Sequence, residues 1–116
     1  MRDAVRHALS VCPVEVTVSV VGGGWKLTIV QLLLDRTLRY GQLRKEIGHI
    51  TDRVLSRQLR ELEADGLVDR VVYAEVPPRV EYSLTPLGAS LREPIAAIEA
   101  WGRSWARARG EEVADG

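Results

Sequence analysis

Apolar residues near the start of the chain recur at the spacing of an amphipathic helix. Trp25, Ile29, Leu32 and Leu33 stand at positions i, i+4, i+7 and i+8. They would share one face of a helix that ends near Asp35. The pattern therefore predicts one helix of a packed core in this segment.

Two further helices are predicted on either side of a short turn. Leu43 and Ile47 lie four residues apart in the segment 41–47, and Gly48-His49-Ile50 then interrupts the pattern. Thr51 follows, where its hydroxyl can cap the next helix. The apolar face of that helix is formed by Val54, Leu55, Leu59 and Leu62.

The end of this helix is also marked in the sequence. Gly66 can adopt the left-handed conformation after the last turn, and Leu67 then stands where a Schellman motif makes an apolar contact with Leu62. Two helices joined by a tight turn, the second with an apolar and a basic face, are typical of a helix-turn-helix.

A β-hairpin is predicted directly after the helix-turn-helix. Leu67–Tyr73 and Arg79–Leu84 are rich in valine. The residues between them, 74–78, include two prolines, which cannot belong to a central strand because they lack ladder donors. The hairpin stands where a wing belongs, so we predict a mainly α fold with a small β-hairpin wing, an α+β winged helix-turn-helix.

Both ends of the chain carry helix signals. Pro13 can open a helix after Cys12, but the valines that follow nearly alternate and imitate a strand, so that segment stays open between the two. Thr85-Pro86 marks another helix start, and Pro94 predicts a kink or a short break in that helix. Its apolar residues recur every three or four positions: Leu87, Leu91, Ile95, Ile98, Trp101 and Trp105.

Composition favours one soluble domain. The chain has 116 residues, of which 46% are hydrophobic and 28% are charged, enough for one core and against general disorder. No apolar run approaches the length of a membrane span, and the N-terminus lacks the apolar region of a signal peptide, so we expect a cytoplasmic protein. We expect one domain over residues 1–108, terminal helices included, and a flexible tail over 109–116.

Charge is unevenly distributed although the net charge is zero. Residues 36–60 hold seven basic and two acidic groups, whereas residues 61–116 hold six basic and eleven acidic groups. A basic middle is expected of a localised anion-binding face. Chance clustering on solvated helix faces would give the same pattern, so charge alone does not decide the partner.

The basic face of the predicted second helix carries the main candidate DNA contacts. Such a helix enters the major groove with its N-terminal part, and Arg53, Arg57 and Arg60 share one face there. We predict that Arg53, Ser56 and Arg57 approach base edges and that Arg60 reaches the backbone. The alternative is a solvated face with an Arg57–Glu61 ion pair.

Four other residues are candidates for the same interface. Thr51 also points outward at the start of that helix. Arg79, at the foot of the wing, could reach a minor groove or a phosphate, or could instead pair with a carboxylate such as Glu75. Tyr40 and Gln42, at the start of the preceding helix, are candidate phosphate donors.

Cys12 is the one cysteine of the chain, so no intrachain disulfide can form. At a helix N-terminus the macrodipole favours the reactive thiolate. Cys12 could still form a disulfide with the same cysteine of a second chain or with a small thiol. The alternative is an inert, buried side chain.

Two tryptophans near the chain end, Trp101 and Trp105, exceed what a small domain usually exposes and indicate a subunit interface.

These patterns resemble the HxlR family of bacterial winged-helix regulators, which are relatives of the MarR type. The resemblance covers residues 12–101, and its most specific part is the wing sequence EVPPRVEYSLT at 75–85. The other matching segments are residues 12–15 (CPVE), 22–25 (GGGW), 40–44 (YGQLR) and 58–67 (QLRELEADGL).

The resemblance implies a homodimer that is held by its first and last helices and binds short palindromic operators. Val14, Ile98, Trp101 and Trp105 are the residues we expect at that interface. Several members respond to oxidants or electrophiles through a cysteine placed like Cys12.

One position departs from the family pattern. The family usually has a lysine directly before the tryptophan, whereas here Gly24 precedes Trp25 and Lys26 follows it. If the usual lysine touches phosphate, that contact is lost here or is made by Lys26 from a different angle.

The predicted function is therefore a sequence-specific DNA-binding transcriptional regulator, a repressor that binds an inverted-repeat operator as a homodimer. Double-stranded DNA, a second copy of the chain and a small oxidant or electrophile are the expected partners. The alternative is a winged-helix module for protein–protein interaction, which the zero net charge leaves open. An enzyme is not expected, because no convergent acid, base or nucleophile set can be assembled, and no cofactor or metal is predicted.

Overall fold

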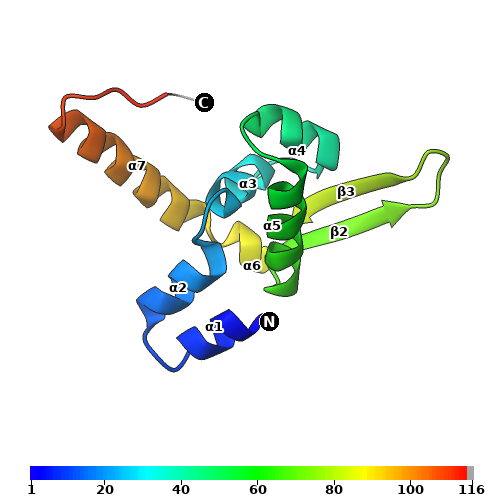
Figure 1. Cartoon of the computed structure of the whole chain (residues 1–116), viewed down its shortest axis with the longest axis horizontal. Helices are drawn as coiled ribbons and strands as arrows, with labels where there is room; N and C mark the ends of the chain where they lie inside the picture. Colours follow the sequence, from blue (N-terminus) through cyan, green and yellow to red (C-terminus); the bar gives the residue numbers. More distant parts are fainter. Residues whose placement is uncertain (115–116) are drawn as a thin grey trace.

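The computed structural model describes residues 1–114, in which helices dominate and a small sheet lies at one side (Figure 1). Within the described residues, five helices precede the hairpin and two follow it. In chain order the elements are α1 (Asp3–Ala8), α2 (Pro13–Val21), α3 (Lys26–Leu33), β1 (Leu38–Arg39), α4 (Tyr40–Ile47), α5 (Asp52–Ala64), β2 (Val68–Tyr73), β3 (Arg79–Leu84), α6 (Pro86–Ala89) and α7 (Arg92–Ala108).

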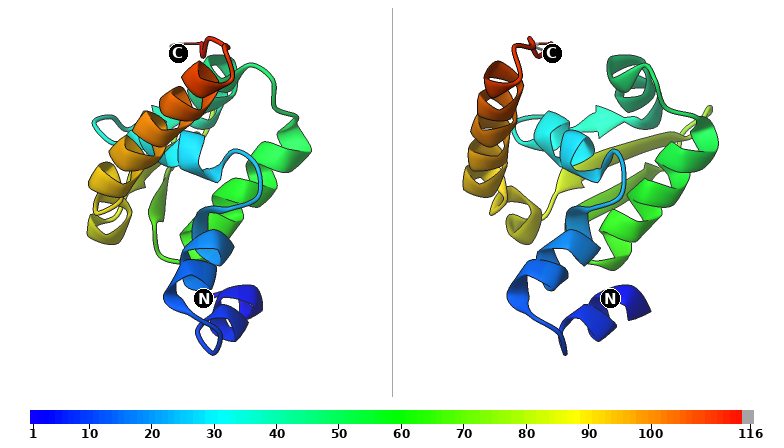
Figure 2. Two further views of the ribbon diagram at one scale, coloured as in Figure 1. Left: turned by 90° about the vertical axis from the view of Figure 1, so that its left-hand side faces the viewer. Right: turned by 60° about the vertical axis from the view of Figure 1, so that its left-hand side comes forward.

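The core lies where α3, α4 and α5 meet the sheet. Leu55, Leu59 and Leu62 of α5 are almost completely buried, and they belong to one apolar cluster with Ile29 of α3 and Leu43 of α4. These are the residues that the helical spacing placed on inner faces. Figure 2 shows α3 between α5 and α7, so α3 is the central helix of the fold.

Both predicted ends of α5 are confirmed. The Thr51 hydroxyl accepts a hydrogen bond from the Val54 N–H at 3.2 Å. At the other end Gly66 has φ +82°, and the Leu67 N–H donates to the Leu62 carbonyl at 2.9 Å. These are the contacts of an N-cap and of a Schellman motif, and they fix the length of α5.

The hairpin forms as predicted, and a third strand joins it. β2 and β3 pair antiparallel from Val68 opposite Leu84 to Tyr73 opposite Arg79. The two-residue strand β1 pairs with the other edge of β3, which gives the order β1-β3-β2. β1 was not predicted, because a strand of two residues is too short to give a periodic signal.

The structure settles or corrects the prediction for two segments near the chain ends. Residues 13–21 form helix α2, so the alternating valines do not make a strand. The break predicted at Pro94 lies earlier, between α6 and α7. Pro94 is the third residue of α7, in the first turn, where its missing N–H would have no partner within the helix.

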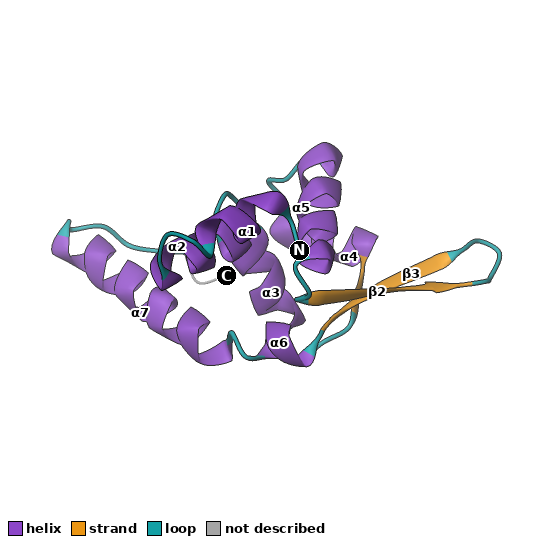
Figure 3. Ribbon diagram, turned by 90° about the horizontal axis from the view of Figure 1, so that it is seen from below, coloured by secondary structure: helices purple, strands orange, loops and turns teal. Residues whose placement is uncertain are grey.

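The helix α7 and the hairpin project from opposite sides of the body (Figures 1 and 3). The longest extent of the molecule is 51 Å.

Residues 109–114 contain no helix or strand, and the last two residues of the predicted tail lie outside the described range. No helix within residues 1–114 is both long and apolar enough to cross a membrane by itself, although α2 and α3, bent by 77°, would meet that criterion together.

One buried glutamine anchors the glycine-rich loop that precedes α3. Gln58 of α5 is 2% exposed. Its side-chain amide donates to the Gly23 carbonyl at 2.6 Å and accepts from the Trp25 N–H at 2.8 Å. A Cβ at Gly24 would lie 2.7 Å from this amide nitrogen, and Gly24 has φ +107°. The loop therefore needs glycine here, because only glycine combines close approach with this conformation.

We predict that Gln58→Ala lowers the free energy of unfolding by about 1–3 kcal/mol, because the Gly23 carbonyl and the Trp25 N–H both lose their hydrogen-bond partner. Denaturant unfolding of the purified protein measures the loss. The matched control is Arg57→Ala on the adjacent exposed position, for which we expect a change within about 0.5 kcal/mol. Equal stability of the two variants would contradict the role given to Gln58.

Candidate nucleic-acid interface

The outer face of α5 carries three exposed arginines. Arg53, Arg57 and Arg60 are all exposed, and within residues 1–114 none of them forms an ion pair or a side-chain hydrogen bond. The alternative pair of Arg57 with Glu61 does not form, because Glu61 is bound elsewhere. This face is thus a cluster of positive charge without an internal counter-charge.

Two acidic residues near the end of α5 pair with the N-terminal segment and with α3. Glu61 binds the Arg2 guanidinium at 3.3 Å and the Lys26 ammonium at 3.2 Å. Arg2 also binds the Asp65 carboxylate at 2.7 Å. Lys26 is only 3% exposed, so it cannot supply the phosphate contact considered above. Its function is to hold α3 against α5.

Tyr40 and Ser56 meet at the start of α5. The Tyr40 hydroxyl lies 2.8 Å from Oδ1 of Asp52 and 3.2 Å from Oγ of Ser56. Burial raises the pKa of Tyr40, and the nearby Asp52 carboxylate adds to this rise. Arg44 binds the same carboxylate at 3.3 Å. These contacts tie α4 to the end of α5 that carries Arg53.

Two other predicted contact residues also act as helix caps. Gln42 accepts a hydrogen bond from the Arg39 N–H at 2.8 Å and so caps α4. The Thr51 hydroxyl caps α5. Both side chains are exposed beside the arginine cluster. The structure therefore gathers seven of the eight predicted DNA contacts around the α4–α5 pair: Tyr40, Gln42, Thr51, Arg53, Ser56, Arg57 and Arg60.

Arg79 is turned toward its own hairpin. Its guanidinium lies 3.4 Å from the Glu75 carboxylate and 3.8 Å from that of Glu81, and it stacks 4.0 Å from the ring centre of Tyr73. This is the arrangement that the sequence analysis gave as the alternative for Arg79. The charge that the wing offers to a partner is correspondingly reduced.

Helices α1, α2 and α7 lie away from the tip of the hairpin (Figure 1), and exposed apolar side chains lie on or beside them. Val14 is 69% exposed and Trp101 is 68% exposed. Cys12 is exposed at the N-cap of α2, which excludes the buried alternative for this thiol within one chain. The large apolar side chains exposed on and beside α1, α2 and α7 include Leu9, Val11, Val14, Val18, Ile98, Trp101 and Trp105. Three of them, Leu9, Val11 and Val18, were not predicted.

Helix α7 is attached to the rest of the fold through the end of α3. Arg92 binds Asp35 at 2.7 Å, and its hydrogen bond and charge hold the pKa of Asp35 below its usual range. The next residue, Arg36, binds Glu46 of α4 at 2.6 Å and lowers the pKa of that carboxyl. Adjacent residues at the end of α3 thus hold α7 and α4.

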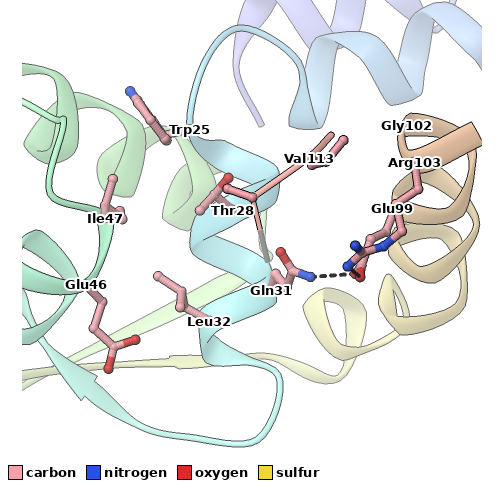
Figure 4. A pocket seen from close by; sticks show the side chains of 11 residues that line it. Trp25, Thr28, Gln31, Leu32, Glu46, Ile47, Glu99, Gly102, Arg103 and Val113 are labelled. Atoms are coloured by element: carbon pink, nitrogen blue, oxygen red, sulfur yellow. Dashed lines mark hydrogen bonds and ion pairs between the residues drawn. The ribbon is translucent and has the colours of Figure 1, made fainter. Parts of the chain in front are cut away.

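A cavity of about 550 Å³ lies beside this junction, between α3, α4 and α7 (Figure 4). Its lining includes Trp25, Thr28 and Leu32 of the α3 segment and Val113 of the C-terminal segment. The hydrogen bond of 2.9 Å between Gln31 and Glu99 crosses it.

In residues 1–114 no three His, Cys, Asp or Glu side chains form a group that could hold a metal ion.

A basic second helix, a tight turn before it and a hairpin after it define a winged helix-turn-helix protein. The chain belongs to the HxlR family, since the family model described as HxlR-like helix-turn-helix matches residues 20–110. The predicted fold class and the predicted family are both confirmed.

Relatives of known class support this assignment. The HTH-type transcriptional regulator YybR of Bacillus subtilis is 47% identical over 93 residues, which are 80% of this chain and 74% of that protein. YkvN of the same organism is 43% identical over 105 residues, 90% of this chain and 86% of that protein. The family and these relatives are transcriptional regulators, which agrees with the prediction that the chain is not an enzyme.

Solved structures of similar proteins give the same fold. The redox regulator HypR in its oxidised form superposes with a TM-score of 0.75 at 47% identity, covering 80% of this chain and 96% of that chain. The reduced form of YodB from B. subtilis superposes with a TM-score of 0.69 at 33% identity, covering 78% of this chain and 89% of that chain.

Proposed function

We propose that this protein is a sequence-specific DNA-binding repressor that places α5 in the major groove. The observation that carries this proposal is the cluster formed by Arg53, Arg57 and Arg60, which are exposed and unpaired within residues 1–114. Arginine pairs bidentately with guanine and clamps phosphates. Arg53 and Arg57 read bases together with Ser56, Arg60 contacts the backbone, and Thr51 lies at the groove entrance.

The α4 helix has a supporting role in this proposal. Tyr40 and Gln42 lie beside the DNA strand that passes the start of α5, where they can meet phosphates. The Tyr40 hydroxyl already bridges Asp52 and Ser56, so its main effect is to orient α5. Arg79 is held by Glu75 and Glu81, and we assign it a smaller share of the affinity than Arg57.

We expect Arg57→Ala to weaken operator binding by about 1–3 kcal/mol, because one base contact is lost. Fluorescence anisotropy on a duplex selected from genomic fragments by the wild-type protein measures this loss. Arg109→Ala removes the same charge beyond the end of α7 and should bind like wild type. If Arg57→Ala also binds like wild type, the recognition role of α5 is wrong.

The salt dependence of binding separates this function from a protein–protein interaction module. A DNA complex weakens steeply as salt rises, because each neutralised phosphate releases counterions. A complex of the wild-type protein with DNA that does not depend on salt, or no DNA binding at low salt, would favour the interaction module.

We also propose that two chains pair through the terminal helices. Exposed tryptophans and valines on one side of a small protein are typical of a subunit interface. The side chains assigned to it are Val14, Ile98, Trp101 and Trp105, all exposed in the single chain. A twofold dimer would present two copies of α5, so its operator is an inverted repeat with half-sites about one helical turn apart.

Trp101→Glu should convert the dimer to a monomer and lower DNA affinity, because a charge would be buried in the interface. Analytical ultracentrifugation reports the mass. Val76→Glu also replaces an apolar residue with a charged one, at the exposed tip of the hairpin. This variant should remain a dimer, with the same mass as the wild-type dimer. A wild-type monomer at micromolar concentration, or a Trp101→Glu dimer, would contradict this interface.

Cys12 is proposed as a thiol sensor within this dimer. The thiol is exposed, and it lies in the chain next to exposed Val11 and two residues before Val14 of the proposed interface. With hydrogen peroxide as oxidant, two Cys12 thiols of paired chains would form one disulfide. The two thiols give two protons and two electrons, and the peroxide leaves as two water molecules.

We expect mild peroxide to change operator affinity of the wild-type protein and to leave Cys12→Ser unchanged. Anisotropy before and after oxidation measures the effect, and non-reducing electrophoresis shows whether a linked dimer forms. An equal response of the two proteins, or no response of either, would remove Cys12 as the sensor.

A further inference from the structure

A cleft of about 380 Å³ separates α5 from the hairpin. Arg60 and Glu63 of α5 line one wall, and Arg70 of β2 and Tyr82 of β3 line the other. The candidate interface described above did not use Arg70. The sequence analysis did not select it either, because it lies outside the basic segment and on a strand.

The register of the hairpin explains why Arg70 faces α5. Side chains alternate between the two faces of a strand, so Arg70 lies on the same face as Val68, which is buried against the body. Arg70 stands opposite Tyr82 in the ladder. Val72 is the next residue on this face and is exposed. Arg70 therefore marks the point at which the hairpin leaves the body.

The cleft contains two positive charges without an internal partner. Within residues 1–114, neither Arg60 nor Arg70 forms an ion pair or a side-chain hydrogen bond. Arg79, further along the hairpin, is by contrast held by two carboxylates. Glu63 is the one acidic residue that lines the cleft, and it does not pair with either arginine. Two guanidinium groups from separate elements that face one cleft favour an anion between them.

We propose that this cleft binds one phosphate of the DNA backbone, with Arg60 and Arg70 as its ligands. The proposal rests on the function proposed above. If α5 lies in the major groove and the hairpin lies along the flanking DNA, the strand between them passes the cleft. The forked donors of two arginines suit phosphate oxygens and make an orienting contact without reading bases. One such clamp in each half-site would fix how closely the hairpin lies against the DNA.

The test is a phosphate scan with Arg70→Gln, which retains most of the side-chain stem. Duplexes carry a neutral methylphosphonate at one backbone position at a time, and anisotropy gives the affinity of wild type, Arg70→Gln and the control Arg109→Gln. We expect Arg70→Gln to bind about tenfold more weakly, on the operator and on an unrelated duplex alike, with a salt slope lower by about 1. Equal thermal unfolding midpoints check that the variants fold.

One position in each half-site should weaken the wild-type protein when neutralised and have no effect on Arg70→Gln. Glu63→Gln removes the negative charge of the cleft and should tighten binding. The clamp is wrong if Arg70→Gln matches Arg109→Gln, or if its loss is confined to the operator, which would indicate base reading. If the wild-type protein binds and Arg57→Ala weakens binding, these outcomes reject the clamp alone. If the wild-type protein does not bind DNA, the proposed function fails as well.

Discussion

The burial of one face of α5 is the constraint on which the rest of the structure depends. Leu55, Leu59 and Leu62 are almost fully buried, and each contributes about 1.5–3 kcal/mol by leaving water. The exposed arginines of the same helix add little to folding, because isolated surface charges rarely do. The two faces of α5 thus have different roles, one in stability and the other in the proposed recognition of DNA. Its inner face fixes its position, and its outer face is free to carry charge that would be costly inside.

The surroundings of α5 preserve this separation. Gln58 satisfies the backbone of the glycine loop, and Glu61 is held by Arg2 and Lys26 on the inner side. Glu61 is therefore engaged by Arg2 and Lys26 and not by Arg57, whereas Glu63 lies in the cleft beside Arg60 without pairing with it. At the end of α3, Asp35 and Arg36 join α7 to α4. This junction connects the helix proposed to pair two chains with the helices proposed to meet DNA.

Elements with a strong local signal could be predicted from the sequence. The ends of α5 followed from Thr51 and Gly66, whose chemistry is local. The nature of residues 13–21 could not be settled, because alternating valines fit a strand until packing decides. The site divides in the same way. Exposed arginines at helical spacing were visible, and the Arg79–Glu75 pair was one of two alternatives, whereas the place of Arg70 depends on how the hairpin packs against α5.

The central claim is that the arginine face of α5 meets DNA while the terminal helices meet a second chain. Photo-crosslinking tests both parts in one experiment, with a crosslinking amino acid placed at position 57 or at position 98 and operator DNA present. The account predicts that position 57 links to DNA bases and that position 98 links two copies of the protein. Crosslinks from position 57 to protein but not to DNA would contradict it.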